Sequence, residues 1–312
     1  MTYDINPIKD SNNELDFKDI LHALISGKWI IISLTTLLSV AGIIYSLLLP
    51  NIYESKALIV PVNTSSGLSG SLKNYSNLAG LAGINLSSSD NEGNSIKAKK
   101  KLSSLSFFEN NILNNIFLPD LMALQSYNSE KNTIIYDKSK YNKNKDIWVR
   151  DYAYPQKQKP SPQESYKKFM KEHFSLSEDK TSGFITLSIR HQSPIIAKQW
   201  TELMFNQINS FYKEKDKLES ERAIKYLNNQ ISVTAVSEVK QVIAELLQEE
   251  TQKLSLVEAR KSYVFDYIDP PVVMEEESEP DKVFILILSF LIGLMLSIAV
   301  VILRHYFIEE KL

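Results

Sequence analysis

The hydrophobic positions of the chain gather in two uncharged runs, one toward each end of the sequence. These runs, residues 29–49 and 283–303, are 21 residues each. A helix of this length spans about 32 Å, close to the roughly 30 Å hydrocarbon core of a bilayer. In the second run 16 of the positions are Leu, Ile, Val or Phe. Buried core helices are usually shorter and carry a polar stripe, so the pattern predicts two transmembrane helices.

Two spans place both ends of the chain on the same side of the membrane. A cleaved signal peptide is the alternative for the first run, but 28 residues precede it and no small-x-small cleavage site follows it. The basic residues that flank the spans are more numerous on the side of the tails: Lys9, Lys18, Lys28, Arg304 and Lys311, against Lys56 and Lys282. This bias predicts cytoplasmic tails at 1–28 and 304–312 and an exported domain at 50–282. In a bacterium these are the two faces of the inner membrane, and the exported domain is periplasmic.

Alternating apolar and polar positions within the exported part predict strands near 53–62, 184–190 and 263–268. Apolar positions at helical spacing predict a helix over 96–114. A second helix is expected over 159–174, because Ser161 can cap it and Pro162 suits its first turn. Residues 63–95 are rich in Ser, Gly and Asn around an apolar kernel from Leu78 to Leu86, which indicates a loop with a short helix. The expected fold class is α+β.

The longest helical pattern follows Pro194, because neither Gly nor Pro occurs again before Pro270. We expect a helix over about 194–247, which would be about 80 Å long and therefore project from an α/β base as an arm. We prefer an unequal hairpin, in which this long helix is followed by a turn within 248–252 and a shorter return helix at 251–262. The alternative is a hairpin that turns at Asn228–Asn229 and packs only on itself. The apolar positions that we expect to face neighbouring copies are Leu218, Ile224, Leu227 and Ile231.

Composition excludes several classes of function. The chain carries a net charge of −2 and has no cysteine, which excludes a polyanion-binding field over the whole chain and any thiol chemistry. A Lys- and Tyr-rich stretch at 131–159 has the composition of a sugar- or phosphate-binding patch, but a solvated loop is the favoured interpretation. The four histidines, His22, His173, His191 and His305, lack metal-ligand spacing, and no nucleophile or phosphate-loop motif occurs. We therefore expect no catalytic, cofactor or metal residues, and no enzyme.

The layout resembles the Wzz-type chain-length determinants, or polysaccharide co-polymerases, of bacterial O-antigen and related surface polysaccharides. The likeness rests on the two terminal spans, on the Pro-containing lead into the last span, and on three stretches: YESKALIVPV, LAGLAGINLSSS and ITLSIRHQSPIIAKQW. The resemblance implies an α/β base beside the membrane, a long helical arm and a ring of several protomers. No kinase domain follows the last span in this sequence, which favours the O-antigen or enterobacterial common antigen branch over the tyrosine-kinase co-polymerases.

The resemblance also implies which residues matter. The matching positions are the proline lead, Pro270, Pro271 and Pro280, and a small-x-x-x-small pair, Gly293 and Ser297, in the last span. Gly42 and Ser46 form a similar pair in the first span. The alternative interpretation is that these small residues simply face lipid.

The implied function is non-enzymatic regulation of the modal length of a lipid-linked O-antigen-type polysaccharide. The implied partners are further copies of the chain and a separate integral-membrane polymerase, with direct binding of the growing glycan left open. The alternative is an envelope scaffold or polysaccharide-export component that recruits other membrane proteins.

Overall fold

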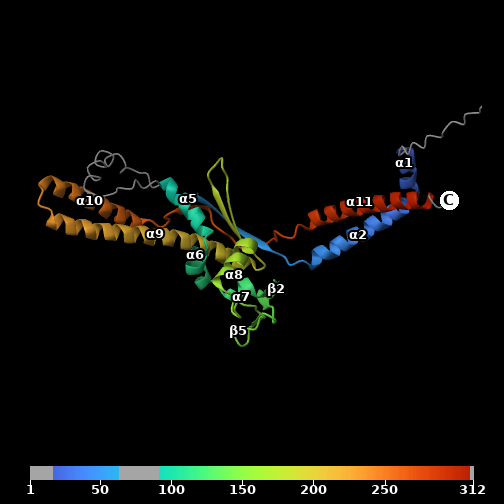
Figure 1. Ribbon diagram of the computed structural model, residues 1–312, viewed down its shortest axis with the longest axis horizontal. Helices are drawn as coiled ribbons and strands as arrows, with labels where there is room; N and C mark the ends of the chain where they lie inside the picture. The colour runs from blue at the N-terminus through green and yellow to red at the C-terminus, as the bar shows by residue number, and fades with distance from the viewer. Residues whose placement is uncertain (1–16, 63–90, 310–312) are drawn as a thin grey trace, which may run out of the picture. The chain divides into compact units, whose positions relative to one another are not determined.

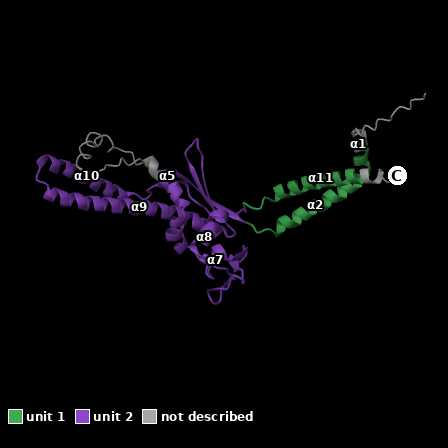
Figure 2. Cartoon of the chain, viewed as in Figure 1, with its two compact units in different colours: residues 1–51, 278–312 green, residues 52–277 purple. Residues whose placement is uncertain are grey.

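A computed structural model describes residues 17–62 and 91–309, which fall into two compact units (Figures 1 and 2). One unit holds the chain up to residue 51 together with residues from 278 onward, and the other holds residues 52–277. The apolar kernel from Leu78 to Leu86 lies outside the described residues. Helices and strands are both present, and the predicted α+β class is confirmed.

The first unit consists of helices, α1 (Phe17–Ser26), α2 (Lys28–Leu48) and α11 (Lys282–Glu309). The helices α2 and α11 lie side by side (Figure 1), and both are long and apolar enough to cross a membrane. Large apolar side chains remain uncovered on their outer faces, for example Trp29 at 74% exposed and Met295 at 74%. A continuous apolar surface of this kind suits lipid rather than water. The sequence pattern gave no indication of α1.

The second unit is built on an antiparallel sheet with the strand order β6-β7-β1-β8. Its strands are β1 (Tyr53–Pro61), β6 (Phe174–Glu178), β7 (Ile185–His191) and β8 (Phe265–Asp269). One face is apolar and buried: Ala57 and Ile59 lie beside Ile185, Leu187 and Ile189. The three strands expected from the sequence are adjacent in this sheet. The fourth, β6, was missed because its alternation is short and its first residue, Phe174, was assigned to the end of the predicted helix over 159–174.

Helix α9 (Pro194–Val233) covers the apolar face of the sheet with its first half. It begins where predicted, since the Ser193 hydroxyl accepts the Ile196 N–H and Pro194 occupies the first turn. Trp200, Met204 and Ile208 are buried in the core that it shares with the strands. Asn209 is buried too, and its Oδ1 accepts the backbone N–H groups of Tyr263, Val264 and Phe265 at 2.7–3.0 Å. This side chain therefore fixes the start of β8 to α9.

The expectation of one helix over 194–247 is wrong. Helix α9 ends at Val233, and after a turn at residues 234–236 the chain returns as α10 (Ser237–Ala259). The turn follows from a run of β-branched residues, ISVTAV, which disfavours a helix interior. Apolar positions on either side of the turn cover each other, with Leu227, Ile243 and Leu246 buried between the two helices. The hairpin alternative was right in kind, but neither of the two expected turns is at the observed position.

The predicted helix over 96–114 is also interrupted. The chain forms α5 (Asn91–Leu102), α6 (Leu105–Phe107), the π-helical η1 (Phe108–Ile112) and the 3-10 turn η2 (Leu113–Asn115). The break occurs at Ser104, whose extended backbone ends one helix and whose hydroxyl accepts the Phe107 N–H of the next. The predicted helix over 159–174 forms α8 (Pro162–Lys168) and η3 (Phe169–His173), with a capping box between Ser161 and Glu164.

The Lys- and Tyr-rich stretch contains short hairpin strands up to residue 148, which the sequence pattern did not predict, and most of its residues are exposed, as expected for a solvated segment. After α7 (Leu118–Met122) come β2 (Leu124–Asn128), β3 (Thr133–Tyr136), β4 (Tyr141–Asn142) and β5 (Ile147–Trp148). The aromatic side chains that pack against one another in its core are Phe117, Tyr136, Tyr141 and Trp148. These rings stabilise the small lobe formed by β2 to β5, whereas Tyr154 is 96% exposed.

Replacing Asn209 by Leu is expected to destabilise the second unit. The substitution removes the acceptor of two buried N–H groups and of the partly buried N–H of Tyr263, which we expect to lower the free energy of unfolding by about 2 to 4 kcal/mol. Thermal or urea unfolding of the full chain in detergent measures the change. Asn206→Leu, an exposed position on the same helix, is the matched control and should shift stability by less than about 0.5 kcal/mol. Equal stability of the two variants contradicts the role given to Asn209.

Candidate functional site: the seam between the two apolar helices

Small and hydroxyl-bearing residues line the contact between α2 and α11. On α2 they are Thr35, Ser39, Gly42 and Ser46, spaced by three or four positions, and on α11 they are Ser289, Gly293 and Ser297, spaced by four. These spacings place each set on one face of its helix. All four small residues predicted for helix contact, Gly42, Ser46, Gly293 and Ser297, belong to these faces.

Gly42 and Gly293 each face atoms of the opposing helix at short range. A methyl group built on Gly293 would lie 3.2 Å from the Cβ of Leu38 and 3.3 Å from the Cα of Thr35, so the opposing backbone leaves no room for a larger side chain. A methyl group on Gly42 would lie 2.5 Å from the Cβ of Ser289, which is a steric clash. A side chain at position 42 would displace Ser289, and even a methyl group at position 293 would push the neighbouring atoms of α2 by a few tenths of an ångström, as in other small-residue helix contacts.

Hydroxyl groups connect the helices beside these glycines. Ser297 Oγ donates to the Leu294 carbonyl at 2.8 Å, so the 3.2 Å contact between Thr35 Oγ1 and Ser297 Oγ has Thr35 as its donor. Thr35 is 6% exposed and Ser297 is fully buried. A hydrogen bond of this kind between apolar helices is worth about 0.6 to 2 kcal/mol. The seam thus joins α2 and α11, which come from opposite ends of the chain. Gly293 and Ser297 face α2 and not lipid alone.

The proline lead lies between β8 and α11. Pro271 is buried, Pro280 is half-buried and Pro270 is exposed. Just after Pro271, the carbonyl of Val272 accepts the Ser55 hydroxyl at 2.9 Å, which holds the start of the lead against β1. The lead is therefore partly anchored within the second unit before the chain continues toward α11.

The four residues expected to face neighbouring copies differ in what they contact. Leu227 is 5% exposed because α10 covers it, so its side chain is not available to another copy, and that prediction is wrong. Ile231 is half-buried against the same cluster, and Ile224 is half-buried as well. Leu218 is 40% exposed and remains a candidate. Sequence reasoning missed Tyr226, which is 55% exposed on the same helix.

Sequence spacing also missed a histidine pair, because its members come from different elements. The rings of His173 and His191 lie 5.6 Å apart beside Trp200. Burial lowers the pKa of His173 to about 4 and that of His191 to about 3, so both are neutral at pH 7. His173 Nδ1 donates to the Arg190 carbonyl, and His191 Nδ1 accepts the Ser193 N–H. Among residues 17–62 and 91–309, no group of three or more His, Cys, Asp or Glu side chains could hold a metal ion. The histidine pair is buried against Trp200.

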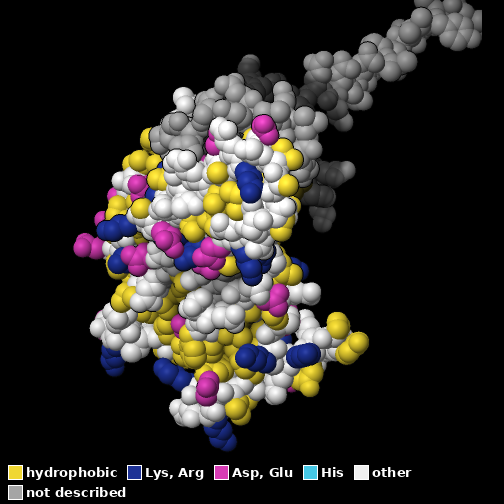
Figure 3. All heavy atoms as spheres, turned by 90° about the vertical axis from the view of Figure 1, so that its left-hand side faces the viewer, with side chains coloured by type: hydrophobic (Ala, Val, Ile, Leu, Met, Phe, Trp, Pro, Cys, Tyr) yellow, Lys and Arg dark blue, Asp and Glu magenta, His cyan; other side chains and the backbone are white. Residues whose placement is uncertain are grey.

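The surface around the α9–α10 turn shows no accumulation of one charge. Figure 3 views this face and shows Lys and Arg interspersed with Asp and Glu among apolar side chains. Such mixing agrees with a net charge near zero for the chain, −2 in all. The face is therefore not an electrostatic site for a polyanion.

Comparison with protein families matches the two regions that contain these helices. The model described as "Wzz: Chain length determinant protein" matches residues 13–122. The model described as "GNVR: G-rich domain on putative tyrosine kinase" matches residues 230–306. No curated protein sequence matches the chain significantly.

Solved structures with a similar arrangement include two co-polymerases. A "full-length bacterial polysaccharide co-polymerase" is 14% identical, with a TM-score of 0.43, over 94% of this chain and 99% of that one. A "Fragment of WzzB, Polysaccharide Co-polymerase from Salmonella Typhimurium" is 15% identical, with a TM-score of 0.29, over 73% of this chain and 100% of that one. Both TM-scores lie below 0.5, and both identities are below 25%.

Enlarging Gly293 is expected to separate α2 from α11. Because the chain has no cysteine, the variant pair Thr35→Cys and Ser297→Cys reports the seam by disulfide cross-linking. We expect Gly293→Leu to lower the cross-linked fraction several-fold, since the Thr35 backbone occupies the required space. Ala299→Leu, at an exposed position of α11, is the control and should leave cross-linking unchanged. Equal cross-linking in both backgrounds contradicts the close approach.

Proposed function

We propose that this chain is a Wzz-type polysaccharide co-polymerase that sets the modal length of a lipid-linked, O-antigen-type glycan. The proposal is supported by the chain-length-determinant model that matches residues 13–122 and by the second family model that matches residues 230–306. Proteins of this family are regulators rather than catalysts. We further propose that this chain acts as a homo-oligomer in the inner membrane together with a separate integral-membrane polymerase.

The observation that carries the proposal is how the two family-matched regions pack. The first, residues 13–122, contains α2 and β1, and the second, residues 230–306, contains β8 and most of α11. In one unit α2 packs along α11, and in the other β1 pairs with β8. The two matched regions are distant in sequence but contact each other in both units. The family assignment thus agrees with the folding of both units.

The oligomer is supported by apolar side chains that the hairpin leaves uncovered. Leu218, Tyr226 and Val233 on α9 are 40%, 55% and 76% exposed. On α10, Val236 lies just before the helix at 54% and Leu256 lies near its end at 48%. Such side chains gain stability when another copy covers them. Sister copies placed side by side supply that cover.

For topology, we propose that both tails are cytoplasmic and that residues 50–282 are periplasmic. Absence of native cysteine allows a test with the single-cysteine variants Tyr154→Cys and Lys311→Cys. Tyr154 is 96% exposed, so a membrane-impermeant maleimide should label Tyr154→Cys in cells with a permeabilised outer membrane. Lys311→Cys should be labelled only after lysis. The reverse labelling pattern rejects the orientation.

Deleting the gene tests the function directly. We expect the modal band of lipopolysaccharide on a gel to disappear, because no other part of the system is proposed to set the length. Wild-type protein and Ala299→Leu should restore the band, whereas Gly293→Leu should not. An unchanged ladder in the deletion strain rejects the proposal. Copurification of envelope proteins without any polymerase favours the scaffold alternative.

A further inference from the structure

The lobe formed by β2 to β5 carries uncovered apolar side chains along β5 and the segment that follows it (Figure 1). Ile147, Val149 and Tyr152 are all exposed. Ile147 and Val149 lie on either side of Trp148, whose ring packs against Tyr141, so strand alternation turns both of them away from the aromatic core. Apolar side chains that their own unit leaves uncovered gain stability when a partner covers them.

An arginine holds this segment in place. Arg150 Nε donates to the Gln158 carbonyl at 2.9 Å, and its Nη2 donates to the Lys157 carbonyl at 2.6 Å and to the Glu164 carboxylate at 2.8 Å. These contacts close the intervening loop at its base. A loop that is already held in one conformation loses less entropy when a partner binds to it.

Lysines without partners accompany the apolar side chains. Lys145, Lys157 and Lys159 are exposed, and none of their ammonium groups forms an ion pair with residues 17–62 or 91–309. Of the acidic residues between them, Asp146 already accepts a tyrosine hydroxyl, and only Asp151 opposes the positive charge. We call the surface formed by Ile147, Val149, Tyr152 and the three lysines the lobe patch. It combines apolar side chains with an excess of positive charge.

A complementary surface lies in the lead between β8 and α11. Val272 and Val273 are 56% and 45% exposed, and Met274 is exposed as well. Because adjacent side chains are all exposed, their own unit does not cover this segment. The segment is nevertheless held in place, since Pro271 before it is buried and the Val272 carbonyl accepts the Ser55 hydroxyl at 2.9 Å.

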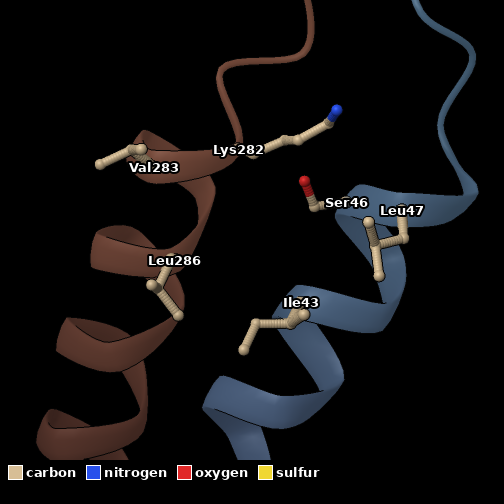
Figure 4. Close-up of a pocket in the computed structure, with 6 residues that line it drawn as sticks. All are labelled: Ile43, Ser46, Leu47, Lys282, Val283 and Leu286. Carbon is tan, nitrogen blue, oxygen red and sulfur yellow. The ribbon is translucent and has the colours of Figure 1, made fainter.

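Unpaired carboxylates follow directly. Glu275 and Glu276 are exposed, and neither forms an ion pair with any residue that the structure describes. We call the surface formed by residues 272–276 the lead patch. Its carboxylates disfavour an anionic lipid surface and favour a cationic, partly apolar protein surface as the partner. The cavity in Figure 4 is lined by residues of α2 and α11 in the first unit and is not part of this patch.

We propose that the lead patch of one copy binds the lobe patch of a neighbouring copy. The apolar side chains of the two patches cover one another, and Glu275 and Glu276 pair with the lysines of the lobe. Tyr154, in the turn that begins at Ala153, stays outside the contact. Both patches are exposed in a single copy, so they do not cover each other there.

The proposed contact is head-to-tail, because the two patches are different surfaces of one chain. Contacts of this kind repeat from copy to copy and close into a ring when the rotation between copies allows it. The inference rests on the homo-oligomer proposed above and names the surfaces that form it.

Cysteine cross-linking of the full chain in membranes tests the contact, because the native chain has no cysteine. Tyr152→Cys and Val273→Cys are placed on chains with different tags and coexpressed. After mild oxidation we expect a cross-linked product that carries both tags. Each variant expressed alone should give at least fivefold less product, since a head-to-tail contact brings unlike patches together. A chain with both substitutions should form a ladder of multimers.

Exchange of charge tests the pairing in the same assay. Lys157→Glu together with Lys159→Glu should lower the cross-linked fraction several-fold, because the carboxylates of the lead patch then meet like charge. Adding Glu275→Lys and Glu276→Lys to that chain should restore at least half of the lost product. All four side chains are exposed, so the thermal unfolding midpoint should stay the same.

The matched control is Lys100→Glu together with Lys180→Glu, which makes the same change in charge at exposed positions of other elements and should leave cross-linking unchanged. Native mass spectrometry in detergent gives the number of copies. An oligomer without the cross-link between positions 152 and 273, or without recovery on charge exchange, overturns this inference and leaves the proposed oligomer intact. A strictly monomeric chain overturns both. Neither result depends on the lipopolysaccharide ladder.

Discussion

The close approach of α2 and α11 is the constraint on which the arrangement of the first unit depends. An apolar side chain gains little by leaving lipid for another apolar surface, so membrane helices associate through tight packing and hydrogen bonds. Gly42 and Gly293 permit this approach, and Thr35 and Ser297 form a hydrogen bond within it. Without such a seam the two ends of the chain would be independent anchors.

In the second unit, backbone hydrogen bonds hold the first and last segments together. Strand β1, which follows α2 in the chain, lies in the middle of the sheet and pairs with both β7 and β8. Strand β8 precedes α11, and Asn209 fixes its first residues to the long helix. The first and last elements of the unit are therefore neighbours. In each unit, a segment from early in the chain therefore contacts a segment from late in the chain.

Sequence reasoning found the elements whose signals are local. The spans are uncharged over their full length, and β7 alternates between a Gly and a Pro that bracket it. The helix start at Pro194 has its own capping serine, Ser193. What the sequence could not give depends on partners distant in the chain. The β-branched run at the α9–α10 turn is a local signal, but the position of the turn also depends on Leu227 packing against Ile243 and Leu246, which are distant in the sequence.

The same limit applies to the site. Small residues spaced by four positions identified the seam, but spacing could not tell whether Gly293 faces the first span, another copy or lipid. The fit of Gly293 against Thr35 and Leu38 required coordinates. His173 and His191 show the reverse case, since no sequence motif connects them and only the packing of η3 against β7 brings them together. Pairing across elements is the information that a single sequence lacks.

The small lobe formed by β2 to β5 has a consequence for how related chains diverge. It contains its own aromatic cluster, lies outside both matched family regions, and contributes no strand to the main sheet. Apart from Ile134, which packs against the core beneath α9, the apolar side chains of β2 to β5 are not part of that core. Most residues of this lobe can therefore vary between related chains while the main sheet and the helices α2 and α11 stay the same.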